Sequence, residues 1–188
     1  MAGSLEVYCG PMFSGKSTII TSEILKARNA GKQVLALKPA YDTRHGEEVV
    51  STHSKLKVRA LSVTDFAIAP APDYRVVFLD EVQFFAPPFF TSDIIQLVKD
   101  WRRRGIDVVA GGLDMDWRGN AFPITAELCA MADKVTKLTA ICSICGWEAS
   151  KTMKLTHTDI DNELGSDGLY EPRCNSHWHL PLGESDPS

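Results

Sequence analysis

No stretch of this sequence approaches the roughly 20 consecutive apolar residues that a membrane-spanning helix needs. Met1 to Glu6 also lack a basic segment followed by an apolar one, which is the pattern of an export signal. The 188 residues contain no internal repeat and no low-complexity block. We therefore expect a cytoplasmic protein without a membrane partner, in which only the tail at 180–188 has the composition of a disordered segment.

An excess of basic residues is also missing. Lys and Arg number 20 against 24 Asp and Glu, and the net charge of -4 argues against a broad basic surface for nucleic acid. The run Arg102 to Arg104 is expected in the last turn of a helix, where cations complement the helix dipole. Five cysteines in a chain without an export signal indicate metal ligands or free thiols, not a disulfide framework.

The sequence does contain a complete G-x-x-x-x-G-K-[ST] pattern, between a strand-like run at Leu5 to Cys9 and a helix-like run that begins near Ser17. Such a loop wraps a polyphosphate with backbone N–H groups, while its Lys reaches the terminal phosphates and its Ser can ligate Mg²⁺. A Gly-rich turn that binds nothing is disfavoured because the fixed positions and both flanks match. We expect a purine nucleoside triphosphate to be bound by Gly10, Pro11, Met12, Phe13, Ser14, Gly15, Lys16 and Ser17.

Strands and helices alternate over the first two-thirds of the chain. Apolar runs at 33–38, 76–81 and 106–110 predict buried strands. Apolar stripes predict one helix that ends at Gly31 and another that is capped by Ser92 or Thr91 and ends at Gly105. The alternation is typical of an α/β fold, a parallel sheet with helices on both faces. With 44% hydrophobic residues, the chain is long enough for this core and a small appended module.

A second nucleotide-binding signal is the pair Asp80 and Glu81, which follows four apolar residues. At the carboxyl end of a parallel strand beside the phosphate loop, Asp80 and Ser17 are placed to hold Mg²⁺. Glu81 is the candidate base, which would orient water in a hydrolase or accept the proton of a substrate hydroxyl in a kinase. The dipeptide alone does not decide between these, and an ordinary surface turn is a third interpretation.

Two close-spaced pairs of soft ligands have the spacing of knuckles that direct their side chains at one tetrahedral Zn²⁺. The four residues are Cys142, Cys145, Cys174 and His177. Because four protein ligands leave no open coordination position, this zinc would be structural. His179 is the alternative to His177, and unpaired thiols are the alternative to a metal. Cys9 and Cys129 have no partner at such spacing and are expected in the core.

The segment between the two knuckles, 146–173, is too long for a simple zinc-ribbon turn. A long segment clamped at both ends by one metal can move and still return to a fixed position, as a substrate lid does. We therefore expect a P-loop domain at 1–138 and a small zinc-ribbon-like domain with a long lid loop at 139–179, followed by the tail at 180–188.

Taken in order, these motifs resemble the thymidine kinases of the cellular, zinc-containing type II family, from about Leu5 to Trp178. The likeness is carried by residues 10–18, 42–44, 80–85, 113–114 and 137–140 and by the zinc pairs. It implies transfer of the ATP γ-phosphate to the 5′-hydroxyl of thymidine in nucleotide salvage, with Glu81 as base, Thr18 added to the ATP site and Arg44 stabilising the transferred phosphoryl group. A homotetramer inhibited by thymidine triphosphate is also implied.

The same resemblance implies a pocket for the nucleoside, in which aromatic and aliphatic walls stack on the base. The matching positions are Met12, Gln83, Phe84, Leu113, Trp117, Phe122, Thr152 and Tyr170. Taken singly, each aromatic side chain fits ordinary core packing as well as ligand binding. Three departures lie on this side of the site: Trp117 stands where Phe is usual, Val82 replaces a common Gly, and 86–90 lengthens a connection. They leave the choice between thymidine and deoxyuridine open.

The main alternative is a P-loop ATPase whose zinc module binds nucleic acid or a protein. It would share Lys16, Ser17, Asp80 and Glu81 with a kinase. A DNA-binding ribbon should be short and basic, whereas 156–168 contains four acidic residues, Asp159, Asp161, Glu163 and Asp167. A nucleotide-binding regulator without turnover is disfavoured because both Arg44 and Glu81 are present. The sequence therefore favours the kinase and predicts no nucleic-acid partner.

Overall fold

The computed structural model describes residues 2–40, 49–51, 57–65, 73–155 and 168–178. Its centre is a six-stranded sheet in the order β5-β2-β6-β7-β1-β8. Every neighbouring pair in this sheet is parallel, which confirms the predicted α/β class. The strands are β1 (Leu5–Cys9), β2 (Val34–Pro39), β5 (Leu61–Val63), β6 (Val76–Leu79), β7 (Asp107–Gly112) and β8 (Lys134–Lys137).

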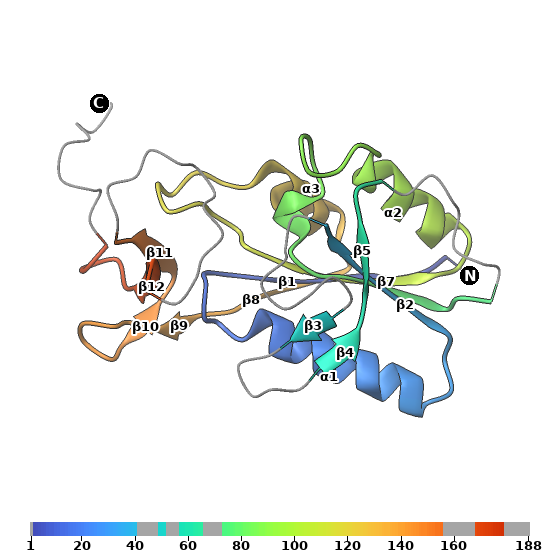
Figure 1. Cartoon of the computed structure of the whole chain (residues 1–188), viewed down its shortest axis with the longest axis horizontal. Helices are drawn as coiled ribbons and strands as arrows, with labels where there is room; N and C mark the ends of the chain where they lie inside the picture. The colour runs from blue at the N-terminus through green and yellow to red at the C-terminus, as the bar shows by residue number, and fades with distance from the viewer. Residues whose placement is uncertain (1, 41–48, 52–56, 66–72, 156–167, 179–188) are drawn as a thin grey trace.

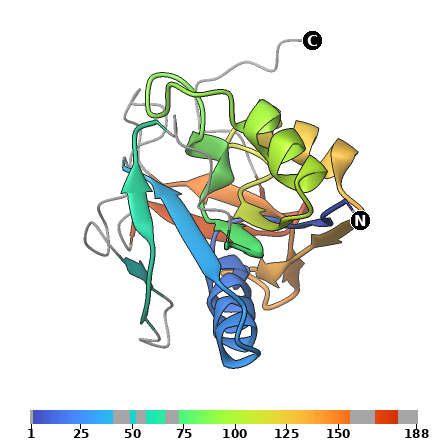
Figure 2. The ribbon, with the colours of Figure 1, turned by 90° about the vertical axis from the view of Figure 1, so that its right-hand side faces the viewer.

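The central strands are continuous apolar runs because helices cover the sheet on both sides. Helix α1 (Lys16–Asn29) lies below the sheet in Figure 1, whereas α2 (Ile94–Arg103) and α3 (Pro123–Met131) lie above it. On the α1 side, Ile20 and Ile24 pack in one cluster with Phe78. On the other side, Trp101 and Leu128 belong to a second cluster. Figure 2 shows the same layers from the side, with the helices apart on the two faces.

Helix α2 begins one residue after the start predicted by a Ser92 cap and two after that predicted by a Thr91 cap. Its N-cap is Asp93, whose side chain accepts a hydrogen bond from the Gln96 N–H at 3.0 Å. The predicted caps, Ser92 and Thr91, were wrong, and Thr91 instead donates its N–H to the Thr64 carbonyl at 2.9 Å. Arg102 and Arg103 lie in the last turn, as predicted, where they complement the dipole.

Two predicted core cysteines lie as expected. Cys9 is only 4% exposed within the core, and Cys129 is half-buried and packs against the same cluster.

Among the described residues, none of the helices is long and apolar enough to cross a membrane. Helix α3, which no predicted element covered, begins with Pro123 at its first turn and has no side-chain cap.

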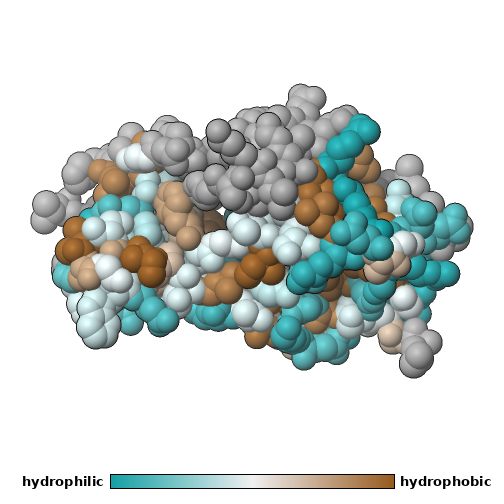
Figure 3. All heavy atoms as spheres, turned by 90° about the horizontal axis from the view of Figure 1, so that it is seen from below, coloured by the Kyte–Doolittle hydropathy of each residue, from teal (hydrophilic) through white to brown (hydrophobic). Residues whose placement is uncertain are grey.

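A small module follows β8 and is built from two antiparallel hairpins, β9 (Ala140–Ile141) with β10 (Glu148–Ala149) and β11 (Lys151–Lys154) with β12 (Tyr170–Arg173). Among the residues that the structure describes, its own apolar cluster consists of Ala140, Cys142 and Ala149, with Cys174 packed beside it. Ile144 and Trp147 are exposed, and apolar spheres gather at the left end of Figure 3, over this module. A small apolar cluster of this kind is often supplemented by a structural metal in small domains.

A short hairpin of β3 (Val49–Ser51) and β4 (Lys57–Arg59) packs near α1. A single 3₁₀ turn, η1 (Val82–Phe84), follows β6 at the carboxyl edge of the sheet. Because β8 runs directly into β9, this carboxyl edge is also the edge that faces the small module, at the left of Figure 1. Ligands of parallel α/β sheets bind at that edge.

Candidate functional site

The predicted phosphate loop joins β1 to α1. It requires glycine at two positions, for a different structural reason at each. Gly15 is the N-cap of α1 and has a left-handed backbone, with φ 84°. Gly10 has φ 141°, and a Cβ at this position would lie 2.4 Å from the carbonyl oxygen of Leu138. The loop therefore needs a left-handed residue at one glycine and a close approach of two backbones at the other.

Lys16 lies inside this loop and is buried. Its ammonium donates to the carbonyl oxygens of Gly10 at 3.1 Å and Pro11 at 2.5 Å and to Ser14 Oγ at 3.2 Å. Burial lowers the pKa of Lys16, while the carboxylates of Glu81 and Asp80 act in the opposite direction. The loop lysine and the two predicted carboxylates therefore share one electrostatic environment.

Asp80 and Glu81 come directly after β6, at the carboxyl edge of the sheet. Asp80 is 7% exposed, and its N–H donates to the Leu37 carbonyl at 3.0 Å. A Cβ on Gly111 would lie 2.9 Å from Ile20 Cγ1 and 3.7 Å from Asp80 Oδ1, so the carboxylate lies on the α1 side of the sheet. Ser17 is in the first turn of α1 on that side. A hydroxyl and a carboxylate are oxygen ligands of the type that Mg²⁺ prefers.

Glu81 has a left-handed backbone, with φ 55°, and serves as the N-cap of η1. Its Oε2 accepts a hydrogen bond from Gln83 Nε2 at 2.6 Å. The other end of the same amide, Gln83 Oε1, accepts the N–H of Leu113 at 2.9 Å. Gln83 and Phe84, both predicted nucleoside contacts, are 6% and 8% exposed, and Phe84 packs edge-on against Phe89. Gln83 thus bridges the candidate base and the chain after β7.

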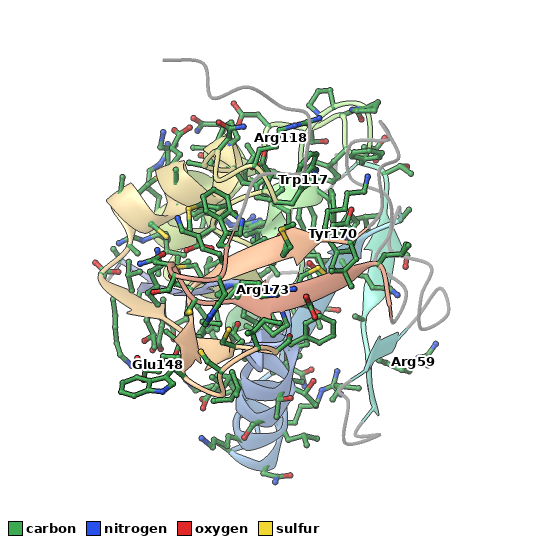
Figure 4. The ribbon with its side chains drawn as sticks, turned by 90° about the vertical axis from the view of Figure 1, so that its left-hand side faces the viewer. Arg59, Trp117, Arg118, Glu148, Tyr170 and Arg173 are labelled. Atoms are coloured by element: carbon green, nitrogen blue, oxygen red, sulfur yellow. The ribbon has the colours of Figure 1, made fainter. Side chains whose placement is uncertain are left out.

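The structure also brings together several other residues of the predicted nucleoside pocket. The Met12 N–H donates to Thr152 Oγ1 at 3.0 Å, so the phosphate loop contacts β11. Tyr170 is paired with Lys154 across the second hairpin, and the Lys154 ammonium lies 5.7 Å from the centroid of the Trp117 ring. Figure 4 shows Trp117 and Tyr170 on the same side of the molecule. Phe122 is half-buried at the start of α3.

Two cationic side chains beside Trp117 did not follow from the sequence motifs. The Arg118 guanidinium lies 4.2 Å from the Trp117 ring centroid, and Figure 4 shows the two side chains next to each other. Lys154 is 2% exposed. A signal for Lys154 existed, because it lies two residues after Thr152 and therefore on the same face of a strand. Arg44 and His179 lie outside the described residues, and so does the part at 156–167 of the segment 146–173 that was predicted to form a lid.

The four predicted zinc ligands converge, and their ligand atoms all lie within 4.8 Å of one another. Cys142 Sγ lies 3.8 Å from His177 Nδ1, Cys145 Sγ 3.8 Å from Cys174 Sγ, and Cys174 Sγ 3.2 Å from His177 Nδ1. Ligands about 2.0–2.3 Å from a tetrahedral zinc are separated by roughly 3.3–3.8 Å. The donor set and its spacing therefore fit a closed, structural zinc site.

Backbone hydrogen bonds hold the two knuckles in this arrangement. The Gly146 N–H donates to the Cys142 carbonyl at 2.9 Å, and the His177 N–H donates to the Cys174 carbonyl at 3.0 Å. Between the knuckles, the Ser143 N–H donates to the Pro172 carbonyl at 3.0 Å. The ligand residues are thus placed by the hairpins themselves.

Comparison with known proteins agrees with this site. The family model described as thymidine kinase matches residues 3–178. A thymidine kinase from Coprothermobacter proteolyticus is 38% identical over 187 residues, which cover 95% of this chain and 92% of that protein. The matched region contains the phosphate loop, both carboxylates and all four candidate zinc ligands.

Proposed function

The chain belongs to the thymidine kinase family, and from this premise we propose which of its residues transfer the ATP γ-phosphate to the 5′-hydroxyl of thymidine. The enzyme is an ATP-dependent kinase of nucleotide salvage, and its products are thymidine monophosphate and ADP. The observation that carries the assignment of residues is that the loop after β1, which holds Lys16, and the end of β6, which Asp80 and Glu81 follow, lie at the same carboxyl edge of the parallel sheet. The contact of the same loop with Thr152 supports it.

The phosphate loop is proposed to bind ATP through residues 10–18. Its backbone N–H groups and the amino end of α1 favour an anion, and Lys16 supplies a positive charge inside the loop. A polyphosphate would exchange the present carbonyl partners of the Lys16 ammonium for charged oxygens, which are stronger acceptors. Ser17 and Asp80 would hold Mg²⁺, which would supply positive charge to neutralise the phosphates.

Glu81 is proposed to accept the proton of the thymidine 5′-hydroxyl. Its left-handed backbone and its hydrogen bond from Gln83 support a fixed carboxylate beside the phosphate loop. Arg44 is proposed, on the family resemblance alone, to stabilise the transferred phosphoryl group. Because the transition state of phosphoryl transfer is loose, positioning and charge stabilisation should contribute more than proton abstraction.

The nucleoside is proposed to lie between the phosphate loop and the second hairpin. Met12, Thr152 and Tyr170 come from these two elements, and their proximity supports the placement. Trp117 would contribute an aromatic wall, as would Phe122 and Phe84, and Leu113 an aliphatic one. The buried indole is larger than a phenyl ring, so it should narrow the pocket around the base.

The remaining proposals concern the domains, the metal site, the oligomeric state and the regulation of the enzyme. We propose a nucleotide-binding domain at 1–138, a zinc-binding domain at 139–179 and a tail at 180–188. One structural Zn²⁺ is proposed at Cys142, Cys145, Cys174 and His177, whose geometry supports it. A cytoplasmic homotetramer with feedback inhibition by thymidine triphosphate is proposed from the family.

The rival function, a P-loop ATPase whose zinc module binds nucleic acid or a protein partner, is disfavoured by a family match that spans the zinc module as well as the P-loop domain. The two functions are separated by incubating the protein with ATP and thymidine and resolving the nucleoside products. Formation of thymidine monophosphate in step with ADP is expected. ADP formation that does not depend on thymidine would favour the rival.

The residue assignment is tested with Glu81→Gln, which keeps the side-chain volume but removes the proton acceptor. We expect binding of ATP and thymidine to persist and turnover to fall about 10²–10⁴-fold, the usual contribution of a general base. Dissociation constants and the thermal midpoint measured on the same preparation serve as controls. Near wild-type turnover in a folded, substrate-binding variant would reject Glu81 as the base.

A further inference from the structure

Gln83 is a buried polar residue whose contacts do not resemble those of a ligand-binding side chain. Both ends of its amide form hydrogen bonds within the protein: Nε2 donates to Glu81 Oε2 at 2.6 Å, and Oε1 accepts from the Leu113 N–H at 2.9 Å. Its exposed fraction is 6%. One N–H and one oxygen lone pair of the amide are used by the protein, and burial gives a nucleoside little access to the others.

The direction of this amide is fixed by its partners. A backbone N–H can only donate, so the Leu113 N–H must face the oxygen of the Gln83 amide. The amide nitrogen then necessarily faces Glu81, whose ionised carboxylate can only accept. The bridge therefore aligns the Glu81 carboxylate with the backbone at the end of β7.

The space for this bridge is provided by Gly112, at the end of β7. A Cβ on Gly112 would lie 2.6 Å from Gln83 Oε1 and 2.6 Å from Val82 Cγ2, distances at which atoms collide. The close approach of η1 to β7 therefore requires glycine here. Val82, which replaces a Gly common in the family, is fully buried at the same contact.

Glu81 is held in a backbone conformation that favours glycine. A non-glycine residue in the left-handed region costs roughly 1–2 kcal/mol, and such residues persist only where surrounding contacts hold them. The Phe84 N–H donates to the Glu81 carbonyl at 3.0 Å, which holds the backbone, and Gln83 holds the side chain. Both restraints act on the residue that the proposed function makes the base.

We propose that Gln83 is a positioning residue for Glu81 in the phosphoryl transfer, and not a ligand of the nucleoside. This inference rests on the proposed function, because it assumes that Glu81 is the base. Gln83 touches no reacting atom; it donates to one oxygen of the Glu81 carboxylate and so fixes the orientation of that carboxylate.

The test is a double-mutant cycle on kcat with Glu81→Gln and Gln83→Met. Gln83→Met keeps the length of the side chain and removes both hydrogen bonds. Misplacing a catalytic group by about 1 Å can cost up to ~10²-fold, so we expect kcat to fall roughly 10- to 100-fold. In the Glu81→Gln background the same substitution should change kcat less than about 3-fold, since residues that act as a unit are non-additive.

A swapped pair provides a readout other than activity. In Glu81→Gln with Gln83→Glu, the new carboxylate can accept from both Leu113 and the new amide, so the bridge is kept with its donor and acceptor reversed. We expect this double variant to melt near the wild type but to remain as inactive as Glu81→Gln alone. Gln83→Glu alone places two carboxylates together and should melt at a lower temperature.

The control is Gln96→Met on α2. Gln96 Nε2 also donates to a carboxylate, Asp100 Oδ1, at 3.0 Å, but on the exposed surface. Its kcat should equal that of the wild type. Equal rate losses from Gln83→Met in both backgrounds, or a raised thymidine dissociation constant with unchanged kcat, would overturn the proposal. Full activity of Glu81→Gln would instead reject the proposed function, so the two failures are distinguishable.

Discussion

The backbone N–H of Met12 donates a hydrogen bond to Thr152 Oγ1 at 3.0 Å, across 140 positions of the sequence. Met12 is in the phosphate loop, and Thr152 is in β11, the second strand after the first zinc knuckle. Thr152 is 5% exposed and Met12 is half-buried, so the bond is partly shielded from water. The small module therefore contacts the proposed ATP site directly, and its position should affect both substrates.

Thr152→Val should weaken binding of both ATP and thymidine. The substitution keeps the shape but leaves the Met12 N–H without its acceptor, which costs roughly 1–3 kcal/mol at a buried site. The expected result is a rise of KM for both substrates. Steady-state kinetics with each substrate varied would measure it, and Thr152→Ser, which keeps the hydroxyl, is the matched control. A rise for thymidine only would mean that Thr152 acts as a nucleoside contact and not as a link.

Removal of zinc should disturb the proposed ATP site through the hydrogen bond between Met12 and Thr152. Metal analysis of the purified protein is expected to find one Zn²⁺ per chain, and His177→Ala should lose it while His179→Ala keeps it. A chelator should melt the small module and abolish activity because β11 would no longer be held. Zinc retained by His177→Ala and lost by His179→Ala would assign the fourth ligand to His179.

The elements that carry the site could be predicted because each has a local signal. The strand expected at 33–38 is Val34–Pro39, and the loop predicted between β1 and α1 is there. The bridge through Gln83 could not be predicted, because the amide oxygen of Gln83 accepts from the N–H of Leu113, which is 30 positions away in the sequence. The contact of Met12 with Thr152 spans a still longer separation. Sequence motifs mark which residues are present, whereas such bridges depend on the packing of distant elements.

The N-cap of α2 shows why local patterns left one boundary undecided. Thr91, Ser92 and Asp93 can all cap a helix. Phe90 is fully buried against the core, and both the N–H and the hydroxyl of Thr91 donate to the Thr64 carbonyl. Tertiary contacts therefore hold Thr91 outside the helix, and the cap falls to Asp93.

Asp93→Ala should consequently destabilise the protein without affecting catalysis. Loss of an N-cap side chain typically costs about 1 kcal/mol. Denaturant unfolding at neutral pH would measure the change, with Ser92→Ala as the neighbouring control that should cost less. A larger loss from Ser92→Ala would show that the cap lies at Ser92 in solution.

A final pair of substitutions separates the two reasons for glycine in positive-φ positions. Gly31 has φ 74° and nothing within 4 Å of an added Cβ, so Gly31→Ala should cost only the left-handed strain, roughly 1–2 kcal/mol, and leave activity unchanged. Gly10→Ala adds a collision with the Leu138 carbonyl, an immobile backbone atom. It should therefore destabilise the protein more and displace the phosphate loop, which weakens ATP binding. Unfolding curves and ATP titrations of both variants measure the difference, and equal stability losses would mean that the loop can shift away from Leu138 at little cost.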